Sequence, residues 1–199
     1  MARNRSLDGD VNVAVEILDC AMRLFNERGY AATSIRDLAE ATGISSSTLY
    51  HHYKNKQQIL YTGLCRFMEY FNRTIIPELQ NLDDSPTERI THASRLHIEL
   101  SIERATELRH VRQFKASLTE QQLRHLLDMQ WHYQDELRTV IKAGVASGEF
   151  AVADLGLTTM AIMDMLNGVR GWYNSGGSMS IDEITEYYAG LVRKTLSRS

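Results

Sequence analysis

The apolar positions of this chain recur three and four residues apart along most of its length, which is the period of amphipathic helices. The pattern predicts a first helix from about Asn12 to Arg28, which Gly29 ends. Further helical stretches follow at 56–80, 86–102, 120–147, 155–173 and from 181 onward, with a shorter segment at 111–118. No segment shows the alternation of a half-buried strand. The sequence therefore predicts an all-α fold of roughly nine helices.

Three features of the long helices refine this picture. Pro77 predicts a kink or break near the end of the helix at 56–80. The helix at 155–173 is apolar around most of its circumference, so we expect it to be covered on two sides. Together with the last helix it predicts a dimer interface, because leaving that surface in water would expose a large apolar patch. In the helix at 120–147 one side collects Leu123, Leu126, Leu127, Trp131, Leu137 and Ile141.

Residues 34–56, SIRDLAEATGISSSTLYHHYKNK, contain two short helices and a tight turn. Ser34 is an expected N-cap with Asp37 at the third position, and Gly43 supplies the left-handed conformation that ends the first helix. Ser45 or Ser46 caps the second helix, which runs through residue 53. This arrangement is the helix-turn-helix, which places its second helix in the major groove of DNA.

The same residues resemble a known family. Residues 25–56, FNERGYAATSIRDLAEATGISSSTLYHHYKNK, are similar to the N-terminal signature of TetR-type transcriptional regulators. The resemblance implies a DNA-binding domain over residues 1–56 and a ligand-binding and dimerisation domain over 57–199. It also implies a homodimer, most often a repressor that leaves its palindromic operator when a small molecule binds. The matching positions are Gly29, Thr33, Ala39, Gly43, Leu49, Tyr50, His52, Tyr53 and Lys56.

The N-terminal residues of a recognition helix reach base edges, and the residues around them hold phosphates. We expect the hydroxyls of the first turn to discriminate bases weakly, so that His51 and Arg36 are the more specific readers. Tyr50, Lys54 and Lys56 are the expected clamps on the DNA backbone. The predicted DNA-binding residues are thus Arg36, Ser46, Ser47, Thr48, Tyr50, His51, Lys54 and Lys56.

The net charge of the whole chain is −3, and that of residues 1–56 is zero, with seven Lys or Arg and seven Asp or Glu. Residues 44–56 nevertheless contain two lysines and no acid. We therefore expect modest non-specific affinity for DNA and few neutralised phosphates per subunit.

The C-terminal tail, GWYNSGGSMSIDEITEYYAGLVRKTL, resembles a TetR subgroup that responds to acyl-CoA thioesters. Trp172, Tyr173, Gly176 and Gly177 match that subgroup, whereas Asn174-Ser175 stands where an Arg-Pro is usual. A pocket in a helical bundle should be mostly apolar with a few polar groups. The candidate ligand-binding residues are Phe71, His92, Phe114, Met129 and Tyr133, each of which also fits an ordinary core position.

Other kinds of chemistry find little support. His125, Asp128 and His132 have metal-ligand spacing but lie on a polar helix face, and no nucleophile elbow, P-loop or dinucleotide fingerprint is present. We therefore expect no enzyme, no cofactor and no metal. Without a secretory signal or a long apolar run, the chain is expected in the cytoplasm, away from the membrane. A DNA-associated structural or protein-interaction factor without a ligand is the alternative function.

Overall fold

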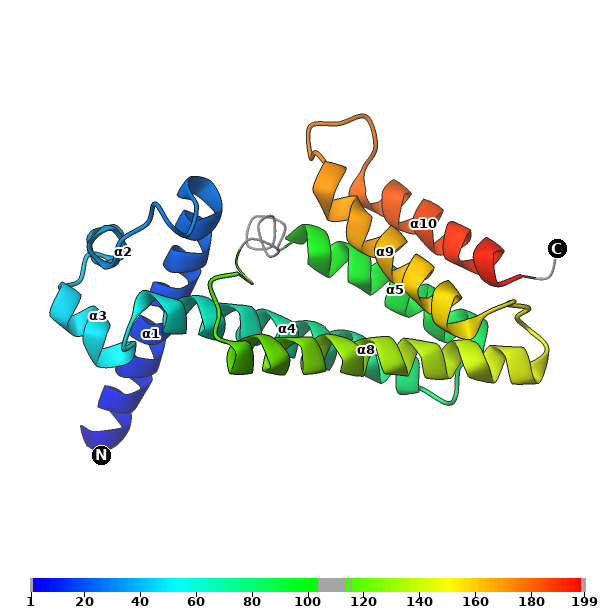
Figure 1. Cartoon of the computed structure of the whole chain (residues 1–199), viewed down its shortest axis with the longest axis horizontal. Coiled ribbons are helices and arrows are strands. Elements are labelled where there is room, and N and C mark those ends of the chain that lie inside the picture. The colour runs from blue at the N-terminus through cyan, green and yellow to red at the C-terminus, as the bar shows by residue number, and fades with distance from the viewer. Residues whose placement is uncertain (1, 104–113, 115, 198–199) are drawn as a thin grey trace. The chain divides into compact units, whose positions relative to one another are not determined.

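The computed structural model (Figure 1) describes the backbone of residues 2–103, 114 and 116–197, and the side chains of these residues from Asn12 onward. All regular secondary structure in this part of the chain is helical, which confirms the predicted all-α fold. The helices are α1 (Ala2–Arg28), α2 (Ile35–Thr42), α3 (Ser46–His52), α4 (Lys56–Gln80), α5 (Pro86–Glu103), α8 (Glu120–Ser147), α9 (Leu155–Trp172) and α10 (Ile181–Leu196).

The described residues form two compact units. The first unit contains the residues up to Phe67 together with those from Phe114 to Leu126, and the second contains the rest. The helices α4 and α8 therefore each contribute residues to both units. The expected domain division between residues 56 and 57 stays a prediction.

Local capping determines where the helices of the first unit begin and end. Ser34 and Asp37 form a reciprocal capping box at the start of α2, and Gly43 ends that helix with φ 69°. Ser45 caps α3 by accepting the N–H of Thr48, and Asn55 caps α4 by accepting the N–H of Gln58 at 2.8 Å. The expected caps at Ser34, Gly43 and Ser45 are thus confirmed, with Ser45 rather than Ser46 at α3.

The core of the first unit lies between α1 and the two short helices. Ile17, Ala21 and Phe25 of α1 are buried, as are Leu38 of α2 and Leu49 of α3. α3 ends at His52, one residue earlier than expected, because the next residue adopts an extended conformation and serves as the C-cap. Burial of these apolar side chains fixes the helix-turn-helix on α1.

In the second unit α5 packs against α9 and α10 (Figure 1). The buried side of α9 carries Ile162, Leu166 and Val169, whereas Leu157, Met160 and Trp172 remain exposed within this unit. The chain closes on itself at the end of α10, where the carbonyl of Leu196 accepts the N–H of Ala151 at 2.9 Å.

Four expectations from the sequence differ from the structure or fall outside it. α1 begins at Ala2 rather than near Asn12, since this stretch contains no proline and its Gly9 costs a helix only about 1 kcal/mol. α4 continues through Pro77 to Gln80 without a break. Trp131 is 54% exposed, because it lies two residues before the buried Tyr133 and so points to nearly the opposite side of α8. The expected helix at 111–118 lies largely outside the described residues.

Candidate nucleic-acid interface

The helix α3 is anchored by its inner side and open on its outer side. Leu49 is fully buried, and the Tyr53 hydroxyl that follows the helix donates to the carbonyl of Ala14 on α1 at 2.9 Å. Of the predicted DNA-binding residues, only Ser46 and Lys56 are half-buried. The exposed ones are Arg36, Ser47, Thr48, Tyr50, His51 and Lys54.

The hydroxyls in the first turn of α3 form a small cluster around the cap. The Ser45 hydroxyl oxygen accepts the N–H of Thr48 at 3.0 Å and lies 2.8 Å from the hydroxyl oxygens of both Ser47 and Thr48. This arrangement holds two of the expected base-contacting hydroxyls in defined rotamers. His51, one turn after Ser47, presents its ring edge-on to His52 with centroids 5.5 Å apart.

Lys56 holds the loop between α1 and α2. Its ammonium group donates to the carbonyls of Tyr30 and Thr33, both at 2.7 Å, and lies 4.3 Å from the centroid of the Tyr30 ring. Burial lowers the pKa of Lys56 below its ordinary value, and the nearby Asp37 carboxylate opposes this only in part. The geometry directs this charge to backbone carbonyls inside the unit, and its expected contact with DNA phosphate stays a prediction.

Other charges of the first unit are also paired. Arg23 lies 3.6 Å from Glu27, and Arg66 lies 3.1 Å from Asp19. Hydrogen bonds from Ser34 hold the pKa of the Asp37 carboxyl below its usual value. The exposed Arg36 and Lys54 are therefore the cations that the structure offers on the α2 and α3 side.

Two of the expected ligand-binding residues meet in the second unit. Phe71 of α4 and Tyr133 of α8 lie edge to face with centroids 5.3 Å apart. Between them is His97 of α5, whose ring lies 5.0 Å from Phe71 and whose Nδ1 is 3.0 Å from the Tyr133 hydroxyl. Burial, reinforced by the charge of Arg170, lowers the pKa of His97 to about 3, so this imidazole is neutral at physiological pH.

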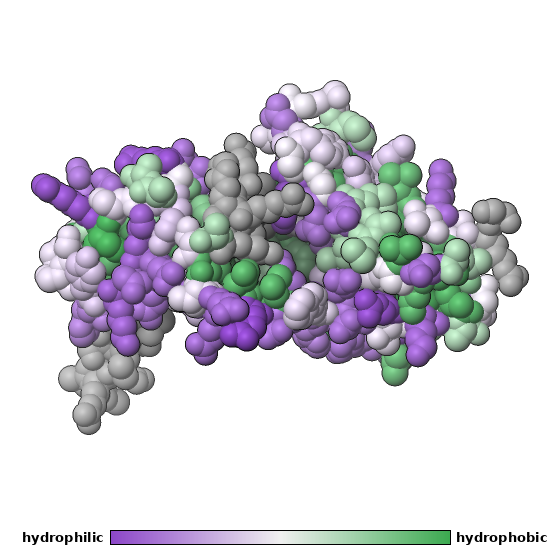
Figure 2. All heavy atoms as spheres, in the orientation of Figure 1, coloured by the Kyte–Doolittle hydropathy of each residue, from purple (hydrophilic) through white to green (hydrophobic). Residues whose placement is uncertain are grey.

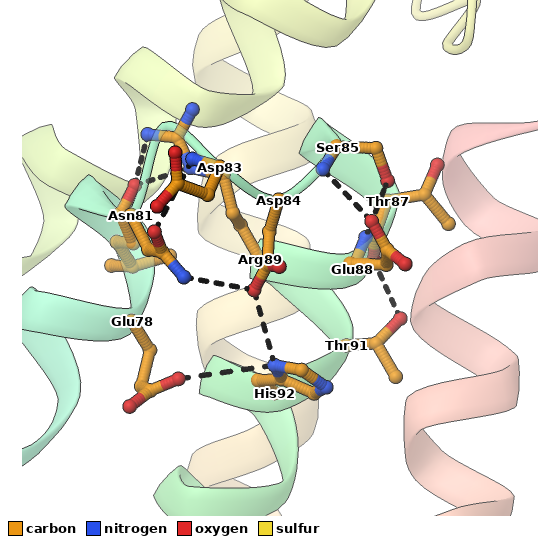
Figure 3. A network of polar contacts seen from close by, with 11 residues as sticks. Glu78, Asn81, Asp83, Asp84, Ser85, Thr87, Glu88, Arg89, Thr91 and His92 are labelled. Carbon is orange, nitrogen blue, oxygen red and sulfur yellow. Dashed lines mark hydrogen bonds and ion pairs between the residues drawn. The ribbon is translucent and has the colours of Figure 1, made fainter.

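The other expected ligand-binding residues lie elsewhere. Phe114 belongs to the first unit, where its ring packs 6.5 Å from Phe25. His92 is partly exposed and lies between two carboxylates, 3.8 Å from Glu78 and 3.7 Å from Asp84 (Figure 3). Met129 is half-buried, and its carbonyl accepts a hydrogen bond from Asn72 at 2.9 Å. The structure thus brings Phe71 and Tyr133 together, with Met129 one helical turn from Tyr133.

Comparison with known families decides the identity of the fold. Residues 17–61 match the family described as "Bacterial regulatory proteins, tetR family". Residues 83–196, more than half of the chain, match the family described as "Tetracyclin repressor-like, C-terminal domain". The chain belongs to the TetR family.

Individual relatives agree along nearly the whole chain. It is 29% identical over 188 residues to the transcriptional repressor KstR2 of Rhodococcus jostii (strain RHA1), covering 89% of this chain and 87% of that protein. Its structure resembles that of PfmR, a TetR family regulator from Thermus thermophilus, with a TM-score of 0.83, 29% identity and coverage of 92% and 99%. The structure of AibR in complex with isovaleryl coenzyme A and operator DNA shares the fold, with a TM-score of 0.81, 24% identity and coverage of 90% and 97%.

Membership in the TetR family makes the chain a DNA-binding transcriptional regulator and not an enzyme. No helix among the described residues is long and apolar enough to cross a membrane. The same part of the chain contains no cluster of three or more His, Cys, Asp or Glu side chains suited to a metal ion.

The role of His92 in ligand binding stays a prediction, and the histidine that the structure buries in the second unit is His97. The signal that identifies His97 is its phase on α5, since it follows the buried Ile90 by seven residues and Ser94 by three, on one helical face. His92 lies out of phase with that stripe and faces Glu78 of α4 and Asp84 of the loop between α4 and α5 instead. Counting helical phase would therefore have distinguished the two histidines.

Proposed function

We propose that this TetR protein is a homodimeric repressor that binds a palindromic operator through α3 and leaves it when a small-molecule effector binds to the second unit. The observation that carries the proposal is the α3 surface, on which Thr48, Tyr50 and His51 are exposed while Leu49 anchors the helix from behind. This is the arrangement by which a recognition helix enters the major groove. The name of the relative KstR2 supports repression rather than activation.

An uncovered apolar surface on α9 and α10 supports the homodimer. Leu157, Met160 and Trp172 of α9 are 67%, 53% and 54% exposed, and Tyr187 of α10 is 62% exposed. Figure 2 shows hydrophobic atoms on the surface over the region of α9 and α10. Gly168 leaves open space on α9 where a partner helix could approach closely. A second copy of the chain on this face would bury these side chains and form a bundle of four helices.

The operator follows from the symmetry of such a dimer. Two α3 helices related by a twofold axis read two inverted half-sites, whose centres lie about 34–36 Å apart in successive major grooves. We propose that Ser46, Ser47, Thr48, His51 and Arg36 face the bases and that Tyr50 and Lys54 hold the backbone.

The effector class is drawn from two sources. The C-terminal tail resembles acyl-CoA-responsive regulators, and AibR, which shares the fold, was crystallised with isovaleryl coenzyme A. Release requires only that the effector bind better to the DNA-incompetent state of the dimer. Because α4 contributes residues to both units, it is the segment through which we expect the two sites to be coupled.

The proposal is tested by operator selection followed by titration. Random duplex DNA is selected on the purified chain, and fluorescence anisotropy on the selected site is then measured with acetyl-, isovaleryl-, octanoyl- and benzoyl-CoA, the matching free acids and CoA alone. We expect a palindromic consensus and release by a thioester at concentrations where CoA has no effect. Selection of no sequence, or of a non-palindromic one, would refute the proposed dimeric binding of the operator. Binding that no thioester releases would refute the acyl-CoA effector.

A further inference from the structure

Four polar atoms in the second unit are buried without a hydrogen-bond partner among the described residues. Three of them are Oδ1 of Asn72 on α4, Oγ of Ser94 on α5 and Nε2 of His97 on α5, and the fourth is Nε of Arg138 on α8, a residue whose guanidinium pairs with Asp135. Ser94 and His97 are each only 1% exposed. An unpaired buried polar group costs about 1–3 kcal/mol, so three of them in one small region call for a functional explanation.

The helices place the three side chains close in sequence or by contact to the His97–Tyr133 pair. Ser94 precedes His97 by three residues, which places both on one face of α5. Asn72 donates to the carbonyl of Met129, which precedes Tyr133 by one turn on α8. The polar atoms therefore come from α4 and α5, within one helical turn of residues that form or neighbour the hydrogen bond between α5 and α8.

The hydrogen-bonding capacity of each atom follows from its known contacts. The amide nitrogen of Asn72 donates to Met129, so its Oδ1 is an acceptor. The hydroxyl of Ser94 can donate and accept. Nδ1 of His97 is hydrogen-bonded to the Tyr133 hydroxyl at 3.0 Å. Nε2 can therefore form one further hydrogen bond, as a donor or as an acceptor according to the tautomer of the ring. The side chain of Asn167 interacts with this ring as a hydrogen-bond partner that raises the pKa of His97, while Nε2 has no partner within hydrogen-bond geometry.

The two side chains joined by this hydrogen bond are neutral and disfavour a buried cation. The imidazole of His97 is uncharged at physiological pH, and burial raises the pKa of the Tyr133 hydroxyl, which therefore stays protonated. The ring of Phe71 stands edge-on to both of these side chains and forms an apolar wall. A cation would be costly to bury here, whereas the charge of Arg170, which reaches the His97 ring, could offset that of an anion, and the test therefore includes a carboxylate probe.

We propose that Asn72, Ser94 and His97 form a recognition site for a neutral oxygen, a hydroxyl or a carbonyl, carried by an otherwise apolar effector. The oxygen can belong to the acyl chain or ring, or be the carbonyl of a thioester. Such an oxygen accepts from Ser94 or His97, and a hydroxyl in addition donates to Asn72. This inference rests on the proposed function, because it assumes that the second unit binds the effector. It adds which chemical group of the effector that unit recognises.

The test uses probes that differ by one oxygen. Binding of octanoyl-CoA is compared with that of S-octyl-CoA, which lacks the carbonyl, and binding of 2-tetralone with that of tetralin and of tetralin-2-carboxylate. Dissociation constants are measured by calorimetry or thermal shift on the full chain. The loss of a hydrogen bond to an oxygen of this kind corresponds to about a tenfold weaker binding. We expect octanoyl-CoA to bind about tenfold more tightly than S-octyl-CoA, and 2-tetralone more tightly than both of its analogues.

Two variants and one control separate recognition from folding. Ser94→Ala removes a polar atom that has no partner, so its melting temperature without ligand should stay level or rise. His97→Phe removes such an atom but also the hydrogen bond to the buried Tyr133 hydroxyl, so its melting temperature should fall. In both variants the preference for the oxygen-bearing probes should disappear. The control is Thr91→Val on the same helix, whose buried hydroxyl already donates to the Thr87 carbonyl at 2.6 Å. It should retain the preference.

The outcomes distinguish this inference from the proposed function, because operator binding is measured on the same samples. If the chain binds its operator and a thioester releases it, but each oxygen-bearing probe binds no better than its analogue, the recognition site is refuted and the repressor stands. Tighter binding of tetralin-2-carboxylate than of 2-tetralone would likewise refute it, by showing that a charge is read. If the wild-type chain binds no operator, the proposed function is refuted instead.

Discussion

Replacement of Lys56 separates a structural role in the reading head, the helix-turn-helix of the first unit, from a contact with DNA. The ammonium group donates to the carbonyls of Tyr30 and Thr33, both at 2.7 Å, and lies over the Tyr30 ring. Lys56→Ala removes all three interactions and leaves both carbonyls without this donor. We expect the loop between α1 and α2 to loosen and the helix-turn-helix to lose stability.

The magnitude can be worked from these contacts. A hydrogen bond to a charged group contributes about 1.5–3 kcal/mol, and a cation–π contact at an exposed site about 0.5–1 kcal/mol. The sum is an upper bound, because Lys56 is only half-buried and solvent screens its charge. The pKa of Lys56 is also lowered by burial, which shows that the cost of desolvation is not fully offset. We therefore expect a loss of about 2 kcal/mol, or about 4–8 °C in melting temperature for a chain of this size.

The assay measures thermal melting and operator affinity for each variant. Affinity is measured between about 50 and 200 mM salt, because a protein with about 6–10 phosphate contacts loses about 10³–10⁵ in affinity over this range. Lys54→Ala is the matched control, since Lys54 is exposed on the α3 side. It should leave the melting temperature unchanged and reduce the salt slope by about 1. Lys56→Ala should lower the melting temperature and leave the slope unchanged. A Lys56→Ala protein that melts like wild type and loses about one unit of slope would refute the reasoning.

Three further substitutions test other parts of the structure. Gly144→Ala would bring a Cβ atom into a steric clash with the buried ring of Phe150. Calorimetry should therefore show that the free energy of unfolding falls by about 1–3 kcal/mol, and an unchanged melting temperature would contradict this packing. For Glu149, burial raises the pKa, but hydrogen bonds from Thr87 and Ser147 outweigh it and hold the pKa below 4.5. The ionised Glu149 carboxylate therefore stabilises the fold above pH 4.5, and this contribution is lost as the pH falls through its lower folded pKa. In melts from pH 7 downward, the difference in melting temperature between wild type and Glu149→Gln should therefore disappear, and a difference that persists at low pH would contradict this account. If the chain forms the proposed dimer, Met160→Asp should convert it to a monomer in light scattering, and a persisting dimer would refute the α9 interface.

Local signals in the sequence were sufficient for the reading head. The caps at Ser34 and Ser45 and the left-handed Gly43 act within three or four residues of the groups that they contact, so their consequences can be read directly from the chain. The family signature occupies the same stretch. The role of Lys56 could not be read in this way, because its partners Tyr30 and Thr33 lie more than 20 residues away and are backbone carbonyls that any residue provides.

The second unit was less predictable because burial there depends on which helix faces which. Trp131 looked like part of an inner stripe, but the buried side of α8 is set by Leu126, Tyr133 and Leu137, and the tryptophan lies outside that phase. The pairing of His97 with Tyr133 joins residues 36 positions apart on two helices. Periodicity identifies a buried face but not the partner across it, so the polar cluster became visible only in three dimensions.

The low charge of the reading head limits how the protein can hold DNA. Residues 1–56 carry seven cations and seven acids, and the structure engages Lys56 with carbonyls and Arg23 with Glu27. Each neutralised phosphate contributes about 0.9 to the slope of log affinity against log salt, so one head that offers Arg36 and Lys54 binds weakly. In the proposed dimer the second head binds at a high effective concentration once the first is engaged, and this linkage supplies most of the affinity. An effector that prevents both heads from engaging at once would therefore release the operator without altering any residue on α3.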